Sequence, residues 1–295
     1  MENKTVIVIG AVNLDICGRP DNAPTLRDSN PGKISFSVGG VGNNIARDLA
    51  LLGLKVRICA AIGDDIYADV VCADCEKHGL DMSLSLKVPG GRTSSYLYVT
   101  DEKGEMHVGI ADMDINESID DGYLAGILDD LNRADAVVID GNMSENTARF
   151  VAENVTVPIY ADPVSGVKGK KLKPALPRLR AFKPNALEAM ILTGENTPEA
   201  AAKKLLSLGV GRVLVSLGAD GMLAAEGDTL IKLPCEKLNI VSTTGCGDCA
   251  AAAMIWADLF GYDLKTTAQA AQRAAAVTAE CDFAVNDKLT AEMLI

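Results

Sequence analysis

The sequence has little of several features on which common protein functions depend. Its 295 residues include only two histidines, His78 and His107, which argues against a histidine-based metal site or catalytic triad. Aspartate and glutamate (40) outnumber lysine and arginine (28), and the resulting charge of −12 argues against a general nucleic-acid binder. Neither an apolar run of roughly 18 residues nor a signal-like first segment is present, so we expect a cytoplasmic protein without a membrane partner.

Two further motifs are missing or incomplete. No G-x-x-x-x-G-K-[ST] sequence occurs, which excludes a P-loop nucleotide site. The eight cysteines include Cys72-x-x-Cys75 and Cys246-x-x-Cys249, whose spacing is that of zinc knuckles. Both pairs fall in predicted helices, however, and the gap between them far exceeds the roughly 15–20 residues of a ribbon site, so we expect reduced thiols rather than zinc.

The order of predicted elements indicates the fold class. With 48% hydrophobic residues the chain can bury a large core. Short β-branched runs alternate with helical segments, a pattern typical of a mostly parallel sheet with helices on both faces. The predicted strands are 4–10, 55–61, 136–140, 157–161 and 211–216, and the predicted helices are 45–52, 66–78, 120–131, 145–153, 250–260 and 264–279.

Two segments do not fit this alternation. Residues 16–38 carry three prolines and no helical periodicity, and residues 92–112 contain two β-like runs, 93–100 and 105–111, around a turn at 101–104. We expect these segments to form a small β-sheet lid on a single domain that spans residues 1–295. A lid suits phosphoryl transfer because water competes with the acceptor hydroxyl.

The stretch Ser242 to Cys249 (STTGCGDC) is the strongest candidate site. A β-rich segment at 238–241 leads into Gly245, Cys246 and Gly247, and a helix follows. Backbone amides at such a helix start bind anions, and Asp248 in the first turn is placed to accept a proton from an attacking hydroxyl. The G-x-G-x-x-A spacing also permits a dinucleotide site, but a second helix follows where that fold requires a strand.

Other polar residues follow predicted strands or open helices. Asn13 and Asp15 come just after the first strand, where open α/β sheets bind ligands. Asn185 and Glu188 are three residues apart on one helix face, which suits either an outer-shell magnesium site or a helix cap. Both interpretations stay open from these residues alone.

Taken together, four motifs in this order resemble the ribokinase-like (phosphofructokinase B type) carbohydrate kinase family over essentially the whole chain. The resemblance implies a three-layer α/β/α fold with a mostly parallel central sheet and a small β-sheet lid. The motifs are Asn13-x-Asp15, Gly39-Gly40-x-Gly42-x-Asn44, Lys183-Pro184-Asn185-x-x-Glu188 and Thr244-Gly245-x-Gly247-Asp248.

The resemblance also implies roles for individual residues. Asp248 would be the catalytic base for a ribose 5′-hydroxyl, and the amides of Gly245, Cys246 and Gly247 would stabilise the transferring phosphoryl group. ATP and Mg²⁺ would be the cofactors, with Glu188 on the metal side. The sugar would lie against Asn13, Asp15, Gly40 and Asn44, and the nucleotide along Asn185, Ser216, Gly218, Gly221, Thr244 and Asn286.

Within that family, the segments 28–34, 93–97, 112–113 and 162–165 are most similar to the pseudouridine kinases. This implies ATP-dependent phosphorylation of pseudouridine. A kinase of another nucleoside or of ribose, and a catalytically silent nucleoside sensor, are the alternatives. The resemblance further implies a homodimer through the lid, and a uracil side made by Ser29, Thr93, Asp112 and Lys168.

The chain departs from the family pattern at two places. Ser242 stands where many members have an aspartate that helps to bind a monovalent cation, so dependence on K⁺ stays open. Cys246 and Cys249 stand where alanine is usual, and a thiol at a helix start is a candidate for redox sensitivity because thiolate is favoured there.

Overall fold

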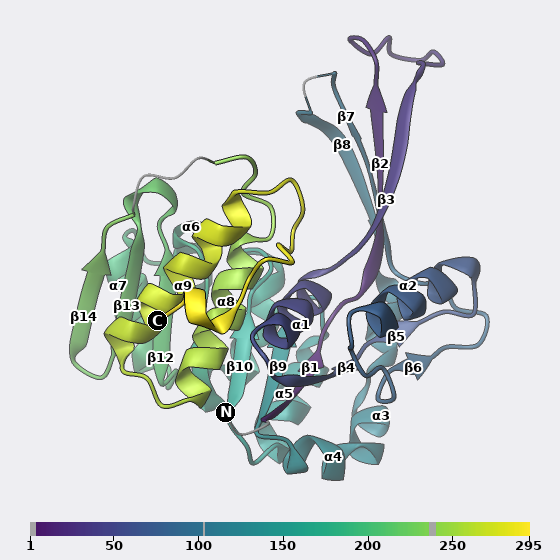
Figure 1. The fold of residues 1–295 in the computed structure, drawn as a ribbon. Helices are drawn as coiled ribbons and strands as arrows, with labels where there is room; N and C mark the ends of the chain where they lie inside the picture. The colour runs from purple at the N-terminus through teal and green to yellow at the C-terminus, as the bar shows by residue number, and fades with distance from the viewer. Residues whose placement is uncertain (1–3, 103, 236–239) are drawn as a thin grey trace.

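The computed structural model describes residues 4–102, 104–235 and 240–295 and contains a large central sheet between two helical layers (Figure 1). The eight strands lie in the order β14-β13-β12-β11-β10-β9-β1-β4, and all neighbours pair in parallel except at β13 and β14. This arrangement confirms the predicted α/β class with a mostly parallel central sheet. Its strands are β1 (Thr5–Ile9), β4 (Lys55–Cys59), β9 (Ala136–Asp140), β10 (Ile159–Asp162), β11 (Leu179–Phe182), β12 (Arg212–Ser216), β13 (Met222–Glu226) and β14 (Thr229–Leu233).

The helices divide between the two faces of this sheet because each strand buries side chains on both sides. Alternate residues of β1 show the division: Val6 and Val8 pack with one helical layer, and Ile7 and Ile9 pack with the other. The first layer contains α1 (Val41–Leu51), α2 (Ile66–Lys77), α8 (Cys246–Leu259) and α9 (Leu264–Ala279). The second contains α3 (Asp121–Gly126), α4 (Leu128–Arg133), α5 (Glu145–Asn154), α6 (Ala186–Thr193), α7 (Pro198–Ser207) and the 3₁₀ segment η2 (Lys168–Arg178).

The lid is a separate four-stranded sheet that stands out from the body (Figure 1). Its strands lie in the order β3-β2-β7-β8, and β2 and β7 pair in parallel between two antiparallel edges. The predicted lid segments are therefore confirmed as β-structure, although the lid begins at Asn13 rather than at residue 16. The strands are β2 (Asn13–Pro20), β3 (Gly32–Gly39), β7 (Ser95–Thr100) and β8 (Met106–Asp112).

Three predicted elements differ from the structure. The strand predicted at 55–61 leaves the main sheet after Cys59, and β5 (Ala61–Ile62) pairs instead with β6 (Leu86–Lys87). The helix predicted at 120–131 is two short helices, since the poor helix former Gly126 ends α3. Part of the segment 238–241 lies outside the described residues, and Ile240 and Val241 are not in a strand. Among the described residues, no helix is long and apolar enough to cross a membrane.

Candidate active site at the carboxyl ends of the strands

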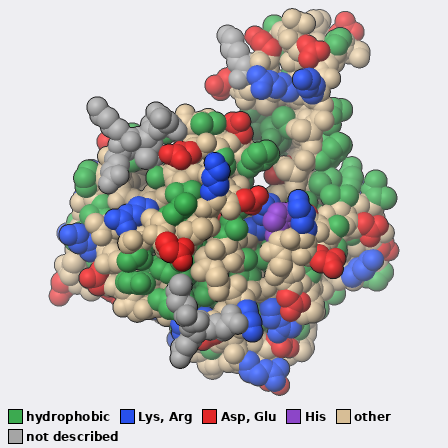
Figure 2. Space-filling model, viewed as in Figure 1, with side chains coloured by type: hydrophobic (Ala, Val, Ile, Leu, Met, Phe, Trp, Pro, Cys, Tyr) green, Lys and Arg blue, Asp and Glu red, His purple; other side chains and the backbone are tan. Residues whose placement is uncertain are grey.

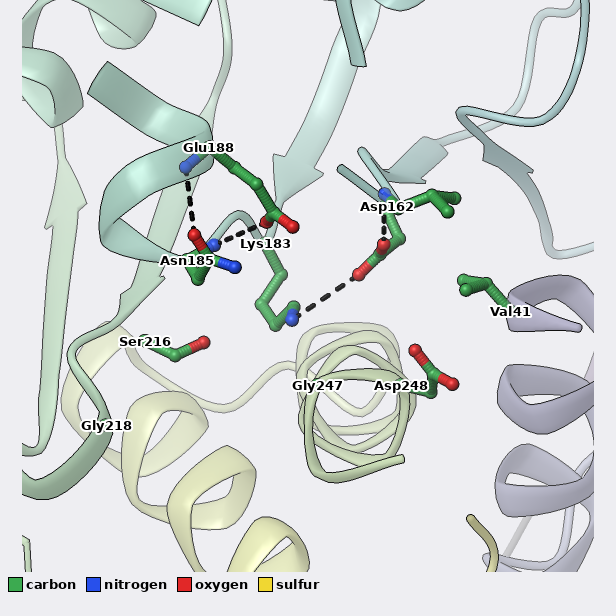
Figure 3. A pocket seen from close by; sticks show the side chains of 10 residues that line it. Val41, Asp162, Lys183, Asn185, Glu188, Ser216, Gly218, Gly247 and Asp248 are labelled. Carbon is green, nitrogen blue, oxygen red and sulfur yellow. Dashed lines mark hydrogen bonds and ion pairs between the residues drawn. The ribbon is translucent and has the colours of Figure 1, made fainter. Parts of the chain in front are cut away.

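A cavity of about 310 Å³ lies where the parallel strands end (Figure 3). Strands β10, β11 and β12 deliver polar groups at their carboxyl ends, and α1, α6 and α8 begin around the same space. Positive helix N-termini and strand-end side chains thus converge there, as expected for a ligand site in an open α/β sheet. The cavity is lined by Val41, Asp162, Val164, Lys183, Asn185, Glu188, Ser216, Gly218, Gly247 and Asp248.

The predicted anion turn forms the start of α8. Gly245 has φ of 78°, and a Cβ at this position would lie 1.8 Å from the carbonyl oxygen of Ala284, so only glycine fits. Cys249 N donates to Gly245 O at 2.9 Å, which is a helical hydrogen bond of α8. The amides of Gly247 and Asp248 come before Cys249 in the first turn, where backbone amides have no partner within the helix. The amide of Cys246, predicted to face the phosphoryl group, instead donates to Thr243 O at 3.3 Å.

Lys183 supplies a positive charge to this turn, and the sequence analysis gave it no role. Its Nζ lies 3.1 Å from the position that a Cβ of Gly247 would occupy, directly over the start of α8. The same Nζ is 3.4 Å from Asp162 Oδ2, and both side chains are buried. One sequence feature could have indicated a role for Lys183. It directly follows β11 and stands two residues before Asn185, which was expected at the nucleotide.

Asp248 faces the cavity and is held by α1. Asn44 Nδ2 donates to Asp248 Oδ2 at 2.8 Å, so the predicted sugar-binding residue contacts the predicted base. Burial raises the pKa of Asp248 to about 7, and the nearby carboxylates of Asp162 and Asp140 add to the increase, while Asn44 and Lys183 oppose it. A carboxylate with a pKa near neutral pH is well matched to a general base.

Asp140 joins the end of β9 to the turn that follows β1. Its carboxylate accepts from Ala11 N at 2.9 Å and from Asn142 N at 2.8 Å and is fully buried. The carboxylate also occupies the space beside Gly10, where a Cβ would lie 2.7 Å from it. Asp140 could not be predicted from a local motif, because its carboxylate acts on Ala11, which lies 129 residues away in the chain.

The residues predicted on the sugar side form one group at the root of the lid. Asn13 Nδ2 donates to Asp15 Oδ1 at 2.6 Å, and burial raises the pKa of Asp15 to about 6. Gly40 begins α1 with φ of 97°, and a Cβ there would lie 2.6 Å from Asn13 Oδ1. Since Asn44 lies one turn further along α1, this helix links the group to Asp248.

On the nucleotide side, both interpretations of Asn185 and Glu188 have support in the structure. The two residues form a capping box: Asn185 Oδ1 accepts from Glu188 N at 2.9 Å, and Glu188 Oε2 accepts from Asn185 N at 2.8 Å. Both residues nevertheless line the cavity, together with Ser216 and Gly218 (Figure 3). Gly221, by contrast, packs against the end of β14, where a Cβ would lie 2.0 Å from Leu233 O.

The oxygen groups here fit an outer-shell magnesium site. Burial and the neighbouring charge of Asp162 raise the pKa of Glu188, which indicates two carboxylates facing one space that a cation would neutralise. Among the described residues, no cluster of three or more aspartate, glutamate, histidine or cysteine side chains could hold a metal by itself. Mg²⁺ commonly takes one or two carboxylates and keeps water and substrate phosphates, and Glu188 and Asp162 would be the carboxylates nearest to it here.

Of the residues predicted on the uracil side, Thr93, Asp112 and Lys168 lie near the root of the lid, and Ser29 lies apart from them. Lys168 Nζ donates to Asn142 Oδ1 at 2.6 Å and lies near Met113, beside the end of β8. Asp112 is paired with Arg92 at 2.9 Å on the surface. Ser29 is exposed at the tip of the lid, in the turn between β2 and β3.

Thr93 belongs to the root of the lid rather than to an exposed binding surface. Its hydroxyl donates to Asp65 Oδ1 at 2.6 Å and accepts from Gly63 N at 3.0 Å, and the residue is buried. The same carboxylate caps α2 by accepting from Ala68 N at 3.0 Å. A hydroxyl with both a donor and an acceptor partner inside the chain is poorly available to a ligand.

The remaining predicted residues lie around the anion turn. Asn286 Nδ2 donates to Val277 O at 2.7 Å, which braces the segment after α9. Thr244 N donates to Ser242 Oγ at 3.2 Å. Burial raises the pKa of Cys246 to about 11, so its thiol is protonated at neutral pH. The raised pKa disfavours the redox-sensitive thiolate considered for this helix start, because burial opposes the effect of the helix dipole.

Comparison with known proteins agrees with this geometry. A family model described as pfkB family carbohydrate kinase matches residues 3–290. The chain is 36% identical to the pseudouridine kinase of Escherichia coli (strain K12) over 300 residues, covering 98% of this chain and 95% of that protein. It is 30% identical to the uncharacterized sugar kinase YeiI of the same organism over 300 residues, covering 99% of this chain and 82% of that protein.

A solved structure is similar over the same length. The carbohydrate kinase from Agrobacterium tumefaciens superposes with a TM-score of 0.88 and 27% identity, covering 99% of this chain and 95% of that chain. The fold, the order of the motifs and these relatives agree. The chain therefore belongs to the PfkB family of carbohydrate kinases, phosphotransferases of the ribokinase-like fold that act on sugars and nucleosides.

Proposed function

We propose that this protein is a pseudouridine kinase, which transfers the γ-phosphoryl group of ATP to the 5′-hydroxyl of pseudouridine in the cytoplasm. The observation that carries the chemistry is the placement of Asp248. A carboxylate with a pKa of about 7 lies at the start of α8, next to the backbone amides of the first helical turn and the buried cation Lys183. These groups are the parts that phosphoryl transfer needs: a base, an anion site and positive charge.

The proposed step is an in-line displacement. Asp248 accepts the proton of the 5′-hydroxyl as its oxygen attacks the γ-phosphorus, and the bond to the β-phosphate oxygen breaks to release ADP. Asn44 orients the carboxylate through its 2.8 Å hydrogen bond. The amides of Gly247 and Asp248, with Lys183, stabilise the negative charge that spreads over the transferring group.

The nucleotide would enter from the side of α6 and β12. Ser216 and Gly218 line this part of the cavity, and Asn185 and Glu188 face it. Mg²⁺ held with the phosphates would neutralise their charge, with Glu188 and Asp162 as the nearby carboxylates. Thr244 and Asn286 are proposed near the nucleotide on the basis of the family resemblance.

The acceptor would lie between α1 and the lid. Asp15 is positioned to accept two hydrogen bonds from a ribose diol, since a carboxylate has two oxygens for a vicinal pair. The amine of Lys168 lies at the edge of this region with Asn142 and suits the carbonyl oxygens of a uracil ring. The 36% identity to a protein named pseudouridine kinase supports that acceptor over other nucleosides.

We also propose that two chains pair through the lid. One face of the lid carries large exposed hydrophobic side chains, and Figure 2 shows such side chains on its strands below a charged tip. Isolated monomers rarely expose a patch of this kind. A partner on that face would bury Ile34, Phe36, Leu97, Val108 and Ile110. Phe36→Glu should then shift the mass measured by light scattering from two chains to one.

Release of ADP with four acceptors tests the proposed function. Pseudouridine, uridine, adenosine and ribose are compared at equal concentrations with ATP and Mg²⁺. We expect the highest kcat/KM with pseudouridine. Higher kcat/KM with uridine, adenosine or ribose would overturn the acceptor assignment, and binding of pseudouridine without ADP release would favour a sensor.

A further inference from the structure

The two faces of the lid differ sharply, and only one carries tyrosine rings. Cross-strand partners lie on the same face of a sheet. Ile16 pairs with Phe36 and Leu97, and Leu97 pairs with Ile110, which defines the hydrophobic face. On the opposite face Asp15 pairs with Tyr96, and Cys17 pairs with Tyr98. Tyr96 and Tyr98 therefore share a face with Asp15, the residue proposed to bind the ribose diol.

The two tyrosine rings are stacked on each other. Their centroids are 5.5 Å apart with 27° between the ring planes, which is a stacked arrangement. Tyr96 leans over Gly109, where a Cβ would lie 2.4 Å from its hydroxyl oxygen, and its hydroxyl donates to Met106 Sδ at 3.2 Å. The missing side chain at Gly109 thus allows the ring to lie across the sheet.

The position of this surface relative to Asp15 is fixed by the strand register. Tyr96 is the direct neighbour of Asp15, and Tyr98 lies two residues further toward the tip. Burial raises the pKa of Tyr98 to about 12, and contact with Cys17 and the charges of Asp15 and Tyr96 add to the increase. Both tyrosines are only half-buried, so ring area remains free for another flat group.

We propose that Tyr96 and Tyr98 form a stacking platform for the heterocyclic base of the acceptor, and that this platform selects nucleosides over free sugars. The inference rests on the proposed nucleoside kinase function. A ribose diol held by Asp15 would place its C1 substituent within reach of the neighbouring ring. A planar base gains stacking energy there, and free ribose, which has no ring π-face, gains none.

Variants of Tyr96 that separate aromatic character from bulk test this platform. Tyr96→Phe keeps the stacking face, and Tyr96→Leu keeps an apolar side chain without it. We expect the KM for pseudouridine to rise about 5- to 100-fold in Tyr96→Leu and less than about twofold in Tyr96→Phe, since base–aromatic stacking has that magnitude. kcat at saturation, the KM for ATP and the inhibition constant of ribose should change little in both variants.

The outcomes separate this inference from the proposed function. An unchanged KM for pseudouridine in Tyr96→Leu would overturn the platform while leaving the kinase assignment intact. Equal weakening of pseudouridine and ribose would also overturn it, because that result indicates a structural role at the lid root. A wild-type enzyme that turns over ribose but no nucleoside would overturn both. Melting temperatures within a few degrees of wild type show that the variants are folded.

Discussion

The cavity at the sheet edge and the lid are built in different ways. At the cavity, polar side chains have partners within the chain: Asn44 holds Asp248, Lys183 pairs with Asp162, and Asn185 and Glu188 cap each other. At the lid, the predicted base contacts are exposed or used elsewhere, as Ser29 and Thr93 show. From this difference we infer that the groups proposed for phosphoryl transfer are held in place within one chain, and we propose that acceptor recognition is completed by further contacts at the lid.

The largest expected effect comes from removing the base. Asp248→Asn keeps the shape and the hydrogen bond capacity of the side chain but cannot accept the proton, so kcat should fall about 10²–10⁴-fold. Nucleotide binding, measured by calorimetry, should be largely kept. Asp228→Asn, in the exposed turn between β13 and β14, is the control. A loss smaller than about tenfold in Asp248→Asn would show that the base is a different group.

Removing the buried cation should have the next largest effect. Lys183→Met leaves the start of α8 without its positive charge, and we expect kcat/KM for ATP to fall about 10- to 10³-fold, the range for loss of one stabilising group. The pKa of Asp248 should also rise, because Lys183 lowers it in the wild type. The exposed Lys203 gives the matched control, Lys203→Met. Equal activity of the two variants would contradict a role for Lys183 in the site.

The pH dependence of activity tests the same site, with a smaller expected change. Asp248 must be deprotonated to act as base, so kcat/KM should rise with pH through a midpoint near 7 and be about tenfold below its plateau at pH 6. Asn44→Ala removes a hydrogen bond that stabilises the carboxylate, so the midpoint should move to higher pH. If Asn44→Ala leaves the midpoint unchanged, the rise of kcat/KM with pH does not report the titration of Asp248.

The smallest expected effect lies at the lid tip. Ser29→Ala should lower kcat/KM for pseudouridine a few-fold, the size of one lost hydrogen bond, and leave the inhibition constant of ribose unchanged. Ser29 is exposed at the tip of the lid. A selective loss with pseudouridine would therefore show that the lid tip contacts the bound acceptor. Equal losses for both ligands would place Ser29 away from the base.

More of the cavity than of the lid could be predicted from the sequence. Gly245, Asp248 and Asn185 sit in local motifs whose backbone geometry follows from the residues themselves, such as a glycine at positive φ before a helix. Asp140 acts through neighbours far away in the chain, which no local pattern contains. Lys183 stands in a local motif beside Asn185, but its approach to the start of α8 is seen only in the folded chain. The hydroxyl of Thr93 has partners in Asp65 and Gly63 that only the folded chain brings together, so its burial could not be predicted from the sequence.

The two faces of the lid could not be assigned from the sequence for a similar reason. Alternation along one strand does not tell which face meets the cavity and which meets solvent. The pairing of Asp15 with Tyr96 gives that answer, since Asp15 contacts Asn13 at the root of the lid. The register between β2 and β7, which are about 80 residues apart in the chain, therefore decides which residues share a face with Asp15.

The site of phosphorylation tests the central claim most directly. Wild-type protein is incubated with ATP, Mg²⁺ and pseudouridine, and the product is examined by ³¹P–¹H correlation NMR. The account predicts a single monophosphate whose phosphorus couples to the two 5′ protons of the ribose. A phosphate on the 2′- or 3′-oxygen, or no phosphorylated nucleoside at all, would contradict it.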